Sequence, residues 1–349
     1  MSIRHALSLL LFSASMMEAD AQAVATDTVA TDPVTTTASH QSIPKRLNQK
    51  ITKMYFNSKY DTAYVERPKE KWLLRLMLNQ TGNHIMAEGT VNDVWSEYDL
   101  HTKYNTNLSL EINYCDLAVS LSLNPAKVKG NYDDYEFNFE YHGQAFSFDI
   151  DYQRATSLTG DMKLGNINHL NEDGLRMNVV NLATYYVFNN RRFSFPAALY
   201  QNYYQLRSAG SWLAGLSFQG GSIKTTEELK ARSPQAPEVH LTFANVGIGA
   251  GYGYNFVFGR HSQWLLHVSE MPTFVVYKHN KLTVNNENKK DSRASLNLIF
   301  NQRASLVYHF SPRYNIGSSL LLSHSLFNDS KVVVRQNKWL ARVFLGMRL

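Results

Sequence analysis

The sequence predicts an all-β protein, a transmembrane antiparallel up-and-down β-barrel of about 12 strands. Three observations support this: apolar and polar residues alternate along most of the chain, short and long connections alternate between these segments, and the last segment ends on the C-terminal residue, Leu349. The 349 residues have a mean hydropathy of −0.33, and no run approaches the roughly 18 apolar residues of a transmembrane helix. A transmembrane barrel has such a composition because only every second residue of each strand faces lipid.

The N-terminal region predicts an exported protein. Arg4 precedes an apolar stretch at 6–17, and small residues follow at 19–23. A basic start, an apolar core and a small-residue cleavage site are the three parts of a secretory signal peptide, which we place at 1–23. Residues 24–42 are mostly Thr, Ala, Asp and Ser. They cannot bury enough apolar surface to order themselves, so we expect a disordered periplasmic linker.

A short polar segment is expected to join this linker to the barrel. We place this periplasmic lead-in segment at 43–70 and the outer-membrane barrel at 71–349. The spacing of Ile51, Met54 and Tyr55 allows a small helix within the lead-in segment.

The alternation is clearest in two consecutive hairpins between positions 108 and 152. In the first, Leu108, Leu110 and Ile112 alternate with polar residues and lead to a tight turn at Cys115-Asp116, which contains the only cysteine. Each hairpin has one apolar and one polar face, as strands between two environments have. Further strands are expected near 71–80, 175–188, 209–221, 245–258, 263–278, 295–310, 313–325 and 338–349.

Connection lengths favour the same topology. Short connections are expected at Cys115-Asp116, 142–144, 259–263 and Ser311-Pro312, and long polar ones near 82–104, 124–134, 154–174, 222–244, 279–294 and 327–337. Their alternation along the chain is that of periplasmic turns and extracellular loops. Residues 189–208 break it, because a long segment with Pro196 stands where a short turn is expected. This segment is compatible with an extra strand pair, a periplasmic helix or a piece folded into the lumen.

The final segment has one apolar face that runs to the last residue. This face consists of Trp339, Ala341, Val343, Leu345, Met347 and Leu349. Barrel-insertion machinery reads such terminal strands and prefers an aromatic last residue, so the leucine is an imperfect match. We expect this machinery and outer-membrane lipid as partners. Trp and Tyr residues near strand ends agree with the aromatic girdles of membrane interfaces.

The sequence also resembles a family of uncharacterised bacteroidete outer-membrane β-barrels, grouped as domain of unknown function 4421. Four stretches carry the likeness: Phe193 to Ala198, Ser208 to Trp212, Asn245 to Tyr252 and Ala341 to Leu349. The Ser-Ala-Gly-Ser-Trp stretch is the most specific, and the likeness covers roughly 43–349. The resemblance implies a barrel fold and an outer-membrane location. It brings no activity and no functional residues to carry over.

If the apolar faces meet lipid, the residues between them point into the lumen. One inward set is acidic and comes from consecutive strands: Glu111, Glu136, Glu140, Asp149 and Asp151. Another is basic and comes from the last strands and the first, which are neighbours once the barrel closes: Arg75, Arg303, Arg342 and Arg348. Strand parity therefore predicts an acidic wall facing a basic wall.

Two interpretations of these walls compete. Opposed charges would create a transverse field across a water-filled pore that favours small polar or zwitterionic solutes, or they would pair and close a narrow lumen. The first interpretation makes the protein a passive channel or transport pore. A structural or adhesive barrel that binds ligands with extracellular loops, such as 154–174 and 279–294, is the alternative within the membrane. A soluble periplasmic β-protein is the alternative outside it.

The sequence predicts neither an enzyme nor a cofactor. A membrane-embedded lipid-modifying enzyme would need a Ser, a His and an orienting polar residue brought together. Ser269 with His267, and Ser323 with His324, show no local motif. We expect neither pair to meet directly, because adjacent strand residues point to opposite faces. The histidines lack the short ligand spacing of a zinc site, and the scattered Lys and Arg, with a formal net charge of +6, argue against nucleic acid as a partner.

Overall fold

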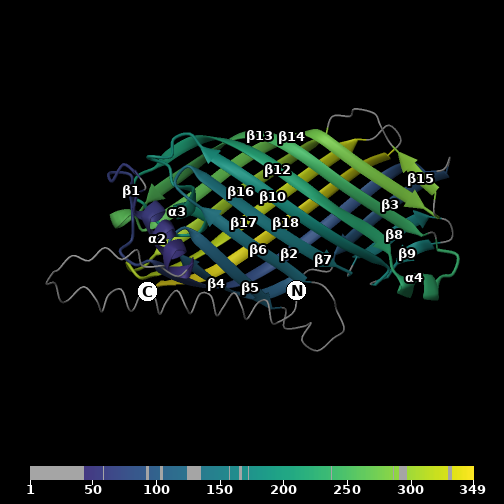
Figure 1. The fold of residues 1–349 in the computed structure, drawn as a ribbon, viewed down its shortest axis with the longest axis horizontal. Coiled ribbons are helices and arrows are strands. Elements are labelled where there is room, and N and C mark those ends of the chain that lie inside the picture. The colour runs from purple at the N-terminus through teal and green to yellow at the C-terminus, as the bar shows by residue number, and fades with distance from the viewer. Residues whose placement is uncertain are drawn as a thin grey trace. The chain divides into compact units, whose positions relative to one another are not determined.

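The computed structural model describes residues 43–57, 59–91, 94–102, 105–123, 135–156, 158–164, 167–171, 173–236, 238–285, 287–290, 297–328 and 332–349 (Figure 1). The expected signal peptide and disordered linker lie outside these residues. The chain forms two compact units, 1–58 and 59–349. In the first, the lead-in segment forms helix α2 (Ile43–Phe56). Lys53 in the last turn of α2 complements the partial negative charge of a helix C-terminus.

The second unit is a closed antiparallel barrel, as the sequence predicts. Its wall in the described part of the chain consists of β2 (Trp72–Val91), β4 (Asn105–Tyr114), β5 (Leu117–Leu123), β6 (Tyr135–His142), β7 (Phe146–Ala155), β10 (Leu175–Val187), β12 (Ala209–Thr225), β13 (Val239–Phe258), β14 (Trp264–Val284), β16 (Leu298–His309), β17 (Tyr314–Asn328) and β18 (Val332–Arg348). Each strand pairs with its neighbour in chain order, and β18 pairs with β2 from Val332 opposite Gly89 to Arg348 opposite Leu73. The C-terminal strand therefore closes the barrel.

The two faces of each wall strand meet different surroundings. On β2, Arg75 is 1% exposed, whereas the next outward residues, Leu76 and Leu78, are 50% and 53% exposed. The outward Trp212 of β12 and Val343 of β18 are 67% and 56% exposed. An outer face of exposed aliphatic and aromatic side chains with a polar interior is the pattern of a barrel in lipid. In the described residues, no helix has the length and apolar character needed to span a membrane.

Aromatic pairs mark the end of the barrel at which β2 begins and β18 ends, here called the terminal end. The rings of Trp72 and Tyr114 lie 4.5 Å apart, and those of Trp264 and Tyr308 also lie 4.5 Å apart. Each pair joins two neighbouring strands in register. Trp and Tyr collect at membrane interfaces because their rings are both apolar and polar. The terminal end therefore has the aromatic level expected at one membrane surface.

At the opposite end, the far end, several segments expected to be loops contain regular structure. β2 continues to Val91, and the same end carries β3 (Val94–Thr102), β8 (Leu158–Leu164), β9 (Ile167–Leu170), α4 (Glu227–Arg232) and β15 (Glu287–Lys290). The prediction of long polar loops near 82–104, 154–174, 222–244 and 279–294 is wrong in this respect. Of these elements, β3, β8, β9 and α4 share with the wall strand β10 an apolar cluster that includes Leu100, Met162, Leu170, Met177 and Leu229. These apolar residues are too widely spaced along the chain to give a local alternation.

Residues 189–208, the segment whose structure the sequence left open, fold into the lumen at the terminal end and are called the plug here. They contain α3 (Phe195–Leu199) and β11 (Tyr204–Gln205), which pairs with β1 (Val65–Glu66). Ser194 caps α3, because its hydroxyl accepts a hydrogen bond from the N–H of Ala197 at 3.1 Å. Pro196 occupies the first turn, where its missing N–H costs nothing.

The plug fills the lumen with apolar side chains. Its residues Phe193, Phe195, Ala197, Ala198 and Tyr203 are at most 1% exposed. From around the barrel wall, side chains of β2, β13, β16 and β18 donate hydrogen bonds to backbone oxygens of the plug. The lumen is therefore packed at the terminal end.

Candidate functional site: the plugged lumen

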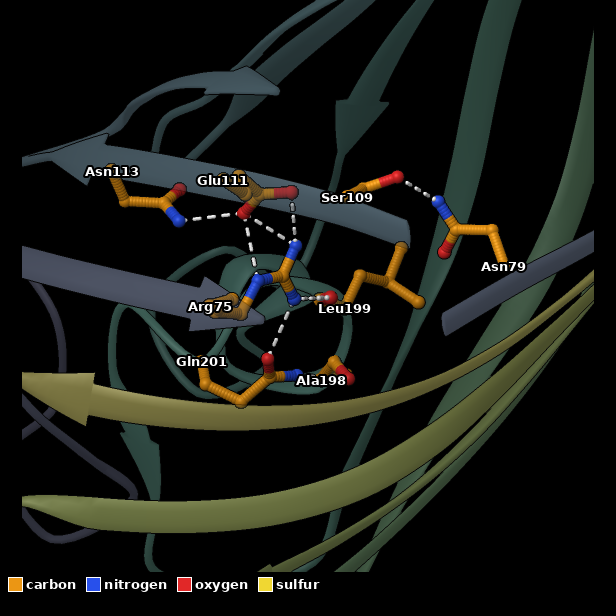
Figure 2. A network of polar contacts seen from close by, with 8 residues as sticks. All are labelled: Arg75, Asn79, Ser109, Glu111, Asn113, Ala198, Leu199 and Gln201. Atoms are coloured by element: carbon orange, nitrogen blue, oxygen red, sulfur yellow. Dashed lines mark hydrogen bonds and ion pairs between the residues drawn. The ribbon is translucent and has the colours of Figure 1, made fainter. Parts of the chain in front are cut away.

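An ion pair between the predicted basic and acidic walls lies at the level of the plug (Figure 2). Arg75 on β2 and Glu111 on β4 are register partners, and both side chains are at most 2% exposed. The guanidinium donates from Nε to Glu111 Oε1 at 2.7 Å and from Nη2 to Oε2 at 2.6 Å. A two-point guanidinium–carboxylate contact combines charge with fixed geometry.

The same guanidinium also holds the plug (Figure 2). Arg75 Nη1 donates to the backbone oxygen of Leu199 at 3.0 Å and to Gln201 Oε1 at 2.7 Å. Glu111 Oε1 accepts a further hydrogen bond from Asn113 at 2.6 Å. These contacts satisfy the buried charges, which would otherwise be costly in a dry interior.

Two other wall strands satisfy carbonyl groups at the C-terminal end of α3. Ser305 of β16 donates from Oγ to the oxygen of Ala198 at 2.6 Å. Arg348 of β18 donates from Nη2 to the oxygen of Gln201 at 2.7 Å and also contacts Tyr204, with its guanidinium 4.1 Å from the ring centroid. The last carbonyls of a helix have no partner within it, and here the wall supplies donors. The plug is thus attached through its backbone.

A hydrogen-bonded row on β13 and β14 attaches the start of the plug. His267 lies between Asn255 Oδ1, 2.7 Å from Nδ1, and Ser269 Oγ, 2.9 Å from Nε2. Asn255 in turn donates from Nδ2 to the oxygen of Ser194 and to Gln205 Oε1, both at 3.0 Å. The expectation that Ser269 and His267 could not meet is wrong, because residues two apart on a strand share one face.

This Ser–His–Asn row has the order of a nucleophile, base and orienting residue, but its surroundings are those of an anchor. His267 is 0% exposed and Ser269 is 6% exposed. The rings of Phe193 and Phe195 cover His267, with centroids at 6.0 Å and 5.5 Å. The neighbouring strand backbone is hydrogen-bonded in the β13–β14–β16 ladder, so those N–H groups are already committed rather than aimed at a substrate oxyanion.

Above the plug, the lumen holds a cavity of about 220 Å³ whose lining includes Leu199 and Tyr200 of the plug. Charged residues of both predicted walls also line it: Asp149, Asp151, Arg303 and Arg342, together with Lys338. The cavity also has neutral polar groups from several strands, including Asn181, Asn301, Ser319, Ser323 and Gln336. Apolar residues such as Ile299 and Leu321 complete the lining, so the chamber has mixed polarity and both signs of charge.

Two ion pairs span this chamber. Arg303 Nη2 of β16 lies 3.2 Å from Asp149 Oδ2 of β7, and Lys338 Nζ of β18 lies 3.2 Å from Asp151 Oδ2. Arg303 Nη2 also donates to the hydroxyl of Tyr185 at 2.6 Å. Strands β16 and β18 are not neighbours of β7 in the sheet, so these pairs cross the lumen. The walls pair with one another and still leave a cavity between the pairs.

The predicted lumen residues thus separate into two levels. Arg75, Glu111 and Arg348 lie at the plug, whereas Asp149, Asp151, Arg303 and Arg342 line the chamber. Glu136 and Glu140 belong to β6, but their side chains lie outside the described part of the structure.

Sequence reasoning missed several lumen residues. Lys338 shares the parity of Arg342 on one strand, so the rule that identified Arg342 also identifies Lys338. Asn255 was missed because Ser194 and Gln205, to which it donates, are in the plug, whose path carries no periodic signal. Over the residues that the structure describes, no cluster of three or more His, Cys, Asp or Glu side chains is arranged to hold a metal ion.

A family model described as domain of unknown function (DUF4421) matches residues 59–348. No curated protein gives a significant match to the sequence.

Among solved structures, the chain is similar to the outer membrane protease OmpT from Escherichia coli, with 7% identity, a TM-score of 0.35, and coverage of 81% of this chain and 98% of that one. It is similar to the translocator domain of the autotransporter NalP from Neisseria meningitidis, with 8% identity, a TM-score of 0.33, and coverage of 87% and 96%. It is also similar to OprG from Pseudomonas aeruginosa, with 10% identity, a TM-score of 0.30, and coverage of 81% and 98%. Likenesses at these scores carry no information on activity.

Proposed function

The chain belongs to the family described as domain of unknown function (DUF4421) and is an outer-membrane β-barrel, and we propose that it is a conduit for small polar solutes that is closed by its own plug. The observation that carries this proposal is the chamber above the plug, whose lining brings carboxylates and cations together. Channels select solutes through the charges and hydrogen-bonding groups that line them. A chamber with both signs of charge favours small zwitterionic or neutral polar solutes over large or apolar ones.

The way in which the plug is attached supports its role as a gate of the lumen. Polar contacts from Arg75, Arg348, Ser305 and Asn255 hold its backbone. Hydrogen bonds between neutral groups contribute only about 0.5–1.5 kcal/mol each, and those donated by the charged Arg75 and Arg348 about 1.5–3 kcal/mol, because both kinds exchange for hydrogen bonds to water. A displaced plug would join the chamber to the terminal end of the lumen. The protein then works by binding and passage, and we propose no covalent chemistry for it.

Planar-bilayer conductance tests the proposal. We expect the wild-type barrel to conduct little, and a variant in which a Gly/Ser linker of equal length replaces 195–203 to conduct steadily. Replacement of α4 (Glu227–Arg232) by the same kind of linker is the matched control, because α4 is a short helix at the far end. This control should conduct like the wild type. Liposome swelling with a neutral amino acid and with a large disaccharide then measures the size and charge of the solutes that pass.

A plug-free barrel that remains folded, judged by its heat-modifiable gel mobility, and still carries no current would overturn the conduit. The proposal assigns no covalent chemistry to the protein. Hydrolysis of lipid or ester substrates by the wild type, lost in Ser269→Ala, would contradict that part of the proposal. In that case the row formed by Asn255, His267 and Ser269 would be a catalytic site exposed when the plug moves.

A further inference from the structure

A carboxyl group lies on the lipid-facing surface of the barrel. Glu270 of β14 is exposed, and it shares the outward face of that strand with Val268 and Phe274, which are 48% and 52% exposed. Its cross-strand partner on β16 is Gln302, whose Nε2 lies 3.4 Å from Glu270 Oε1. Its register partner on β13 is Tyr252, and outward positions further along the neighbouring strands are apolar, for example Ile248 and Leu306.

The position of Glu270 along the strand places it inside the apolar band. β14 begins at Trp264 in the aromatic level of the terminal end, where Trp264 contacts Tyr308. Strand residues rise by about 3.3 Å each, and a tilt near 40° leaves roughly 15 Å of height between Trp264 and Glu270. The apolar band of such barrels is about 25 Å tall. Glu270 therefore lies well within the membrane, near the middle of this apolar band.

A carboxyl group in this position is poorly satisfied by lipid. Acyl chains have no hydrogen-bonding groups, and a polar group without a partner in hydrocarbon is costly. Gln302 provides one long contact, but a carboxyl group and an amide together have further donors and acceptors. The pair is self-complementary. When two copies of the chain meet, the Gln302 amide of each copy can donate a hydrogen bond to the Glu270 carboxyl group of the other.

Small side chains beside this pair allow another surface to approach. The next row of register partners towards the terminal end runs from Val268 to Ala304 on β16, then to Leu320 on β17 and Ala341 on β18. Two of these four side chains are single methyl groups. Small residues next to hydrogen-bonding side chains are typical of contacts between transmembrane helices, and the same close approach is open to this face of the barrel.

We propose that the outer face of β14 and β16 is the interface of a homodimer in the membrane, in which Glu270 of each copy contacts Gln302 of the other. A two-fold axis through the patch places identical surfaces opposite each other, so the chain alone supplies both the donor and the acceptor. A different protein would need its own matching polar pair at the same depth. The proposal is independent of the conduit, because the patch faces away from the lumen.

Disulfide trapping tests the interface directly. A Cys115→Ser background removes the only native thiol, which is buried. Ala304→Cys in this background should give a crosslinked dimer in intact outer membranes on mild oxidation. The matched control, Leu110→Cys, places a thiol at a 46% exposed lipid-facing position of β4, across the barrel. It should stay monomeric. Absence of the Ala304→Cys dimer, equal crosslinking at Leu110→Cys, or crosslinking of Ala304→Cys to a different protein would each overturn the proposal.

A second measurement examines the polar pair itself. Mass measurement by light scattering in mild detergent should give a dimer for the wild type and for Glu270→Gln, which keeps an acceptor and adds donors. Glu270→Leu and Gln302→Leu should lower the dimer fraction at least ten-fold at equal protein concentration. An unchanged dimer in both leucine variants, with folding verified by heat-modifiable mobility, would contradict the assigned contact. If either leucine variant fails to fold, the trapping experiment decides the proposal alone.

Discussion

Arg75 and Glu111 form an ion pair within the barrel wall, and the same guanidinium that contacts the carboxylate also binds the plug at Leu199 and Gln201. One buried charge therefore joins two wall strands to the segment that fills the lumen. Loss of either partner leaves the other charge buried without its counter-ion, which is among the most destabilising single changes in proteins.

The variant Glu111→Leu should accordingly lower the free energy of unfolding by about 3–5 kcal/mol. The double variant Arg75→Met/Glu111→Leu should lose clearly less, because it removes both charges together. Urea unfolding in detergent, followed by tryptophan fluorescence, gives both values. Equal losses in the single and double variants would mean that the ion pair is not the source of the effect.

The orientation of Arg75 and Glu111 could be read from the sequence, whereas their joint contact with the plug could not. Strand parity is a local property: a residue between two outward leucines on a strand points inward whatever its partners are. The same rule predicts that Asp149, Arg303 and Arg342 point inward, and all three line the chamber. Strand parity also identifies the last segment as a strand of the wall. Because a wall strand pairs on both edges, this strand at the chain end needs the first strand as its second neighbour.

The plug depends on contacts between residues far apart in the chain. Ser194 and Gln205 have no visible role in sequence, and Asn255, which donates a hydrogen bond to each, is 61 and 50 residues away from them. The far-end strands were missed for a similar reason. β3 pairs with β2 and also with β8, so part of its stability comes from a strand more than 50 residues away. Local periodicity carries no information on such pairings.

Asn255 should control how tightly the plug is held. Asn255→Ala removes both donors to the plug and the acceptor beside His267. Because two hydrogen bonds contribute roughly 1–3 kcal/mol together, the backbone amides of 194–205 should exchange with deuterium about ten-fold or more faster. Hydrogen–deuterium exchange with mass spectrometry measures this.

Asn245→Ala is the control for that experiment. Asn245 is a buried asparagine on the inward face of the same strand, ten residues nearer the far end. Its replacement should leave exchange in the plug unchanged. Equal acceleration in both variants would show a general loosening of β13 and not the release of an anchor.

Gly251 should be intolerant of a side chain. A Cβ at this position would meet the backbone oxygen of Glu270 and would lie 2.7 Å from the Cα of Met271, neither of which can move without displacing β14. Gly251→Ala should therefore lower the free energy of unfolding by about 1–3 kcal/mol, as overpacking does. At Gly253 the nearest atoms are side-chain carbons at 3.2 Å, and Gly253→Ala should be milder. Denaturant midpoints compare the two, and the reverse order would refute the packing argument.

Asp116 should make the stability of the barrel depend on pH. It lies in the turn between β4 and β5, outside the membrane-spanning strands, and accepts a hydrogen bond from Tyr203 of the plug at 3.0 Å. Burial raises the pKa of its carboxyl group from 3.8 to about 7, although the Tyr203 hydroxyl and Arg67 both favour the charged form. Between these pH values the folded protein keeps a proton that the unfolded chain has lost. The corresponding stability is complete below about pH 4 and is lost as the pH rises through about 7.

The unfolding midpoint of the wild type should therefore fall between pH 5 and pH 8, by an amount equivalent to at most roughly 3 kcal/mol. Asp116→Asn cannot ionise and keeps an acceptor for Tyr203, so its midpoint should stay nearly constant over the same range and exceed that of the wild type at pH 8. Glu228→Gln, which alters an exposed carboxyl group on α4, should retain the full slope of the wild type. If Asp116→Asn retains that slope as well, a different buried group is responsible for it.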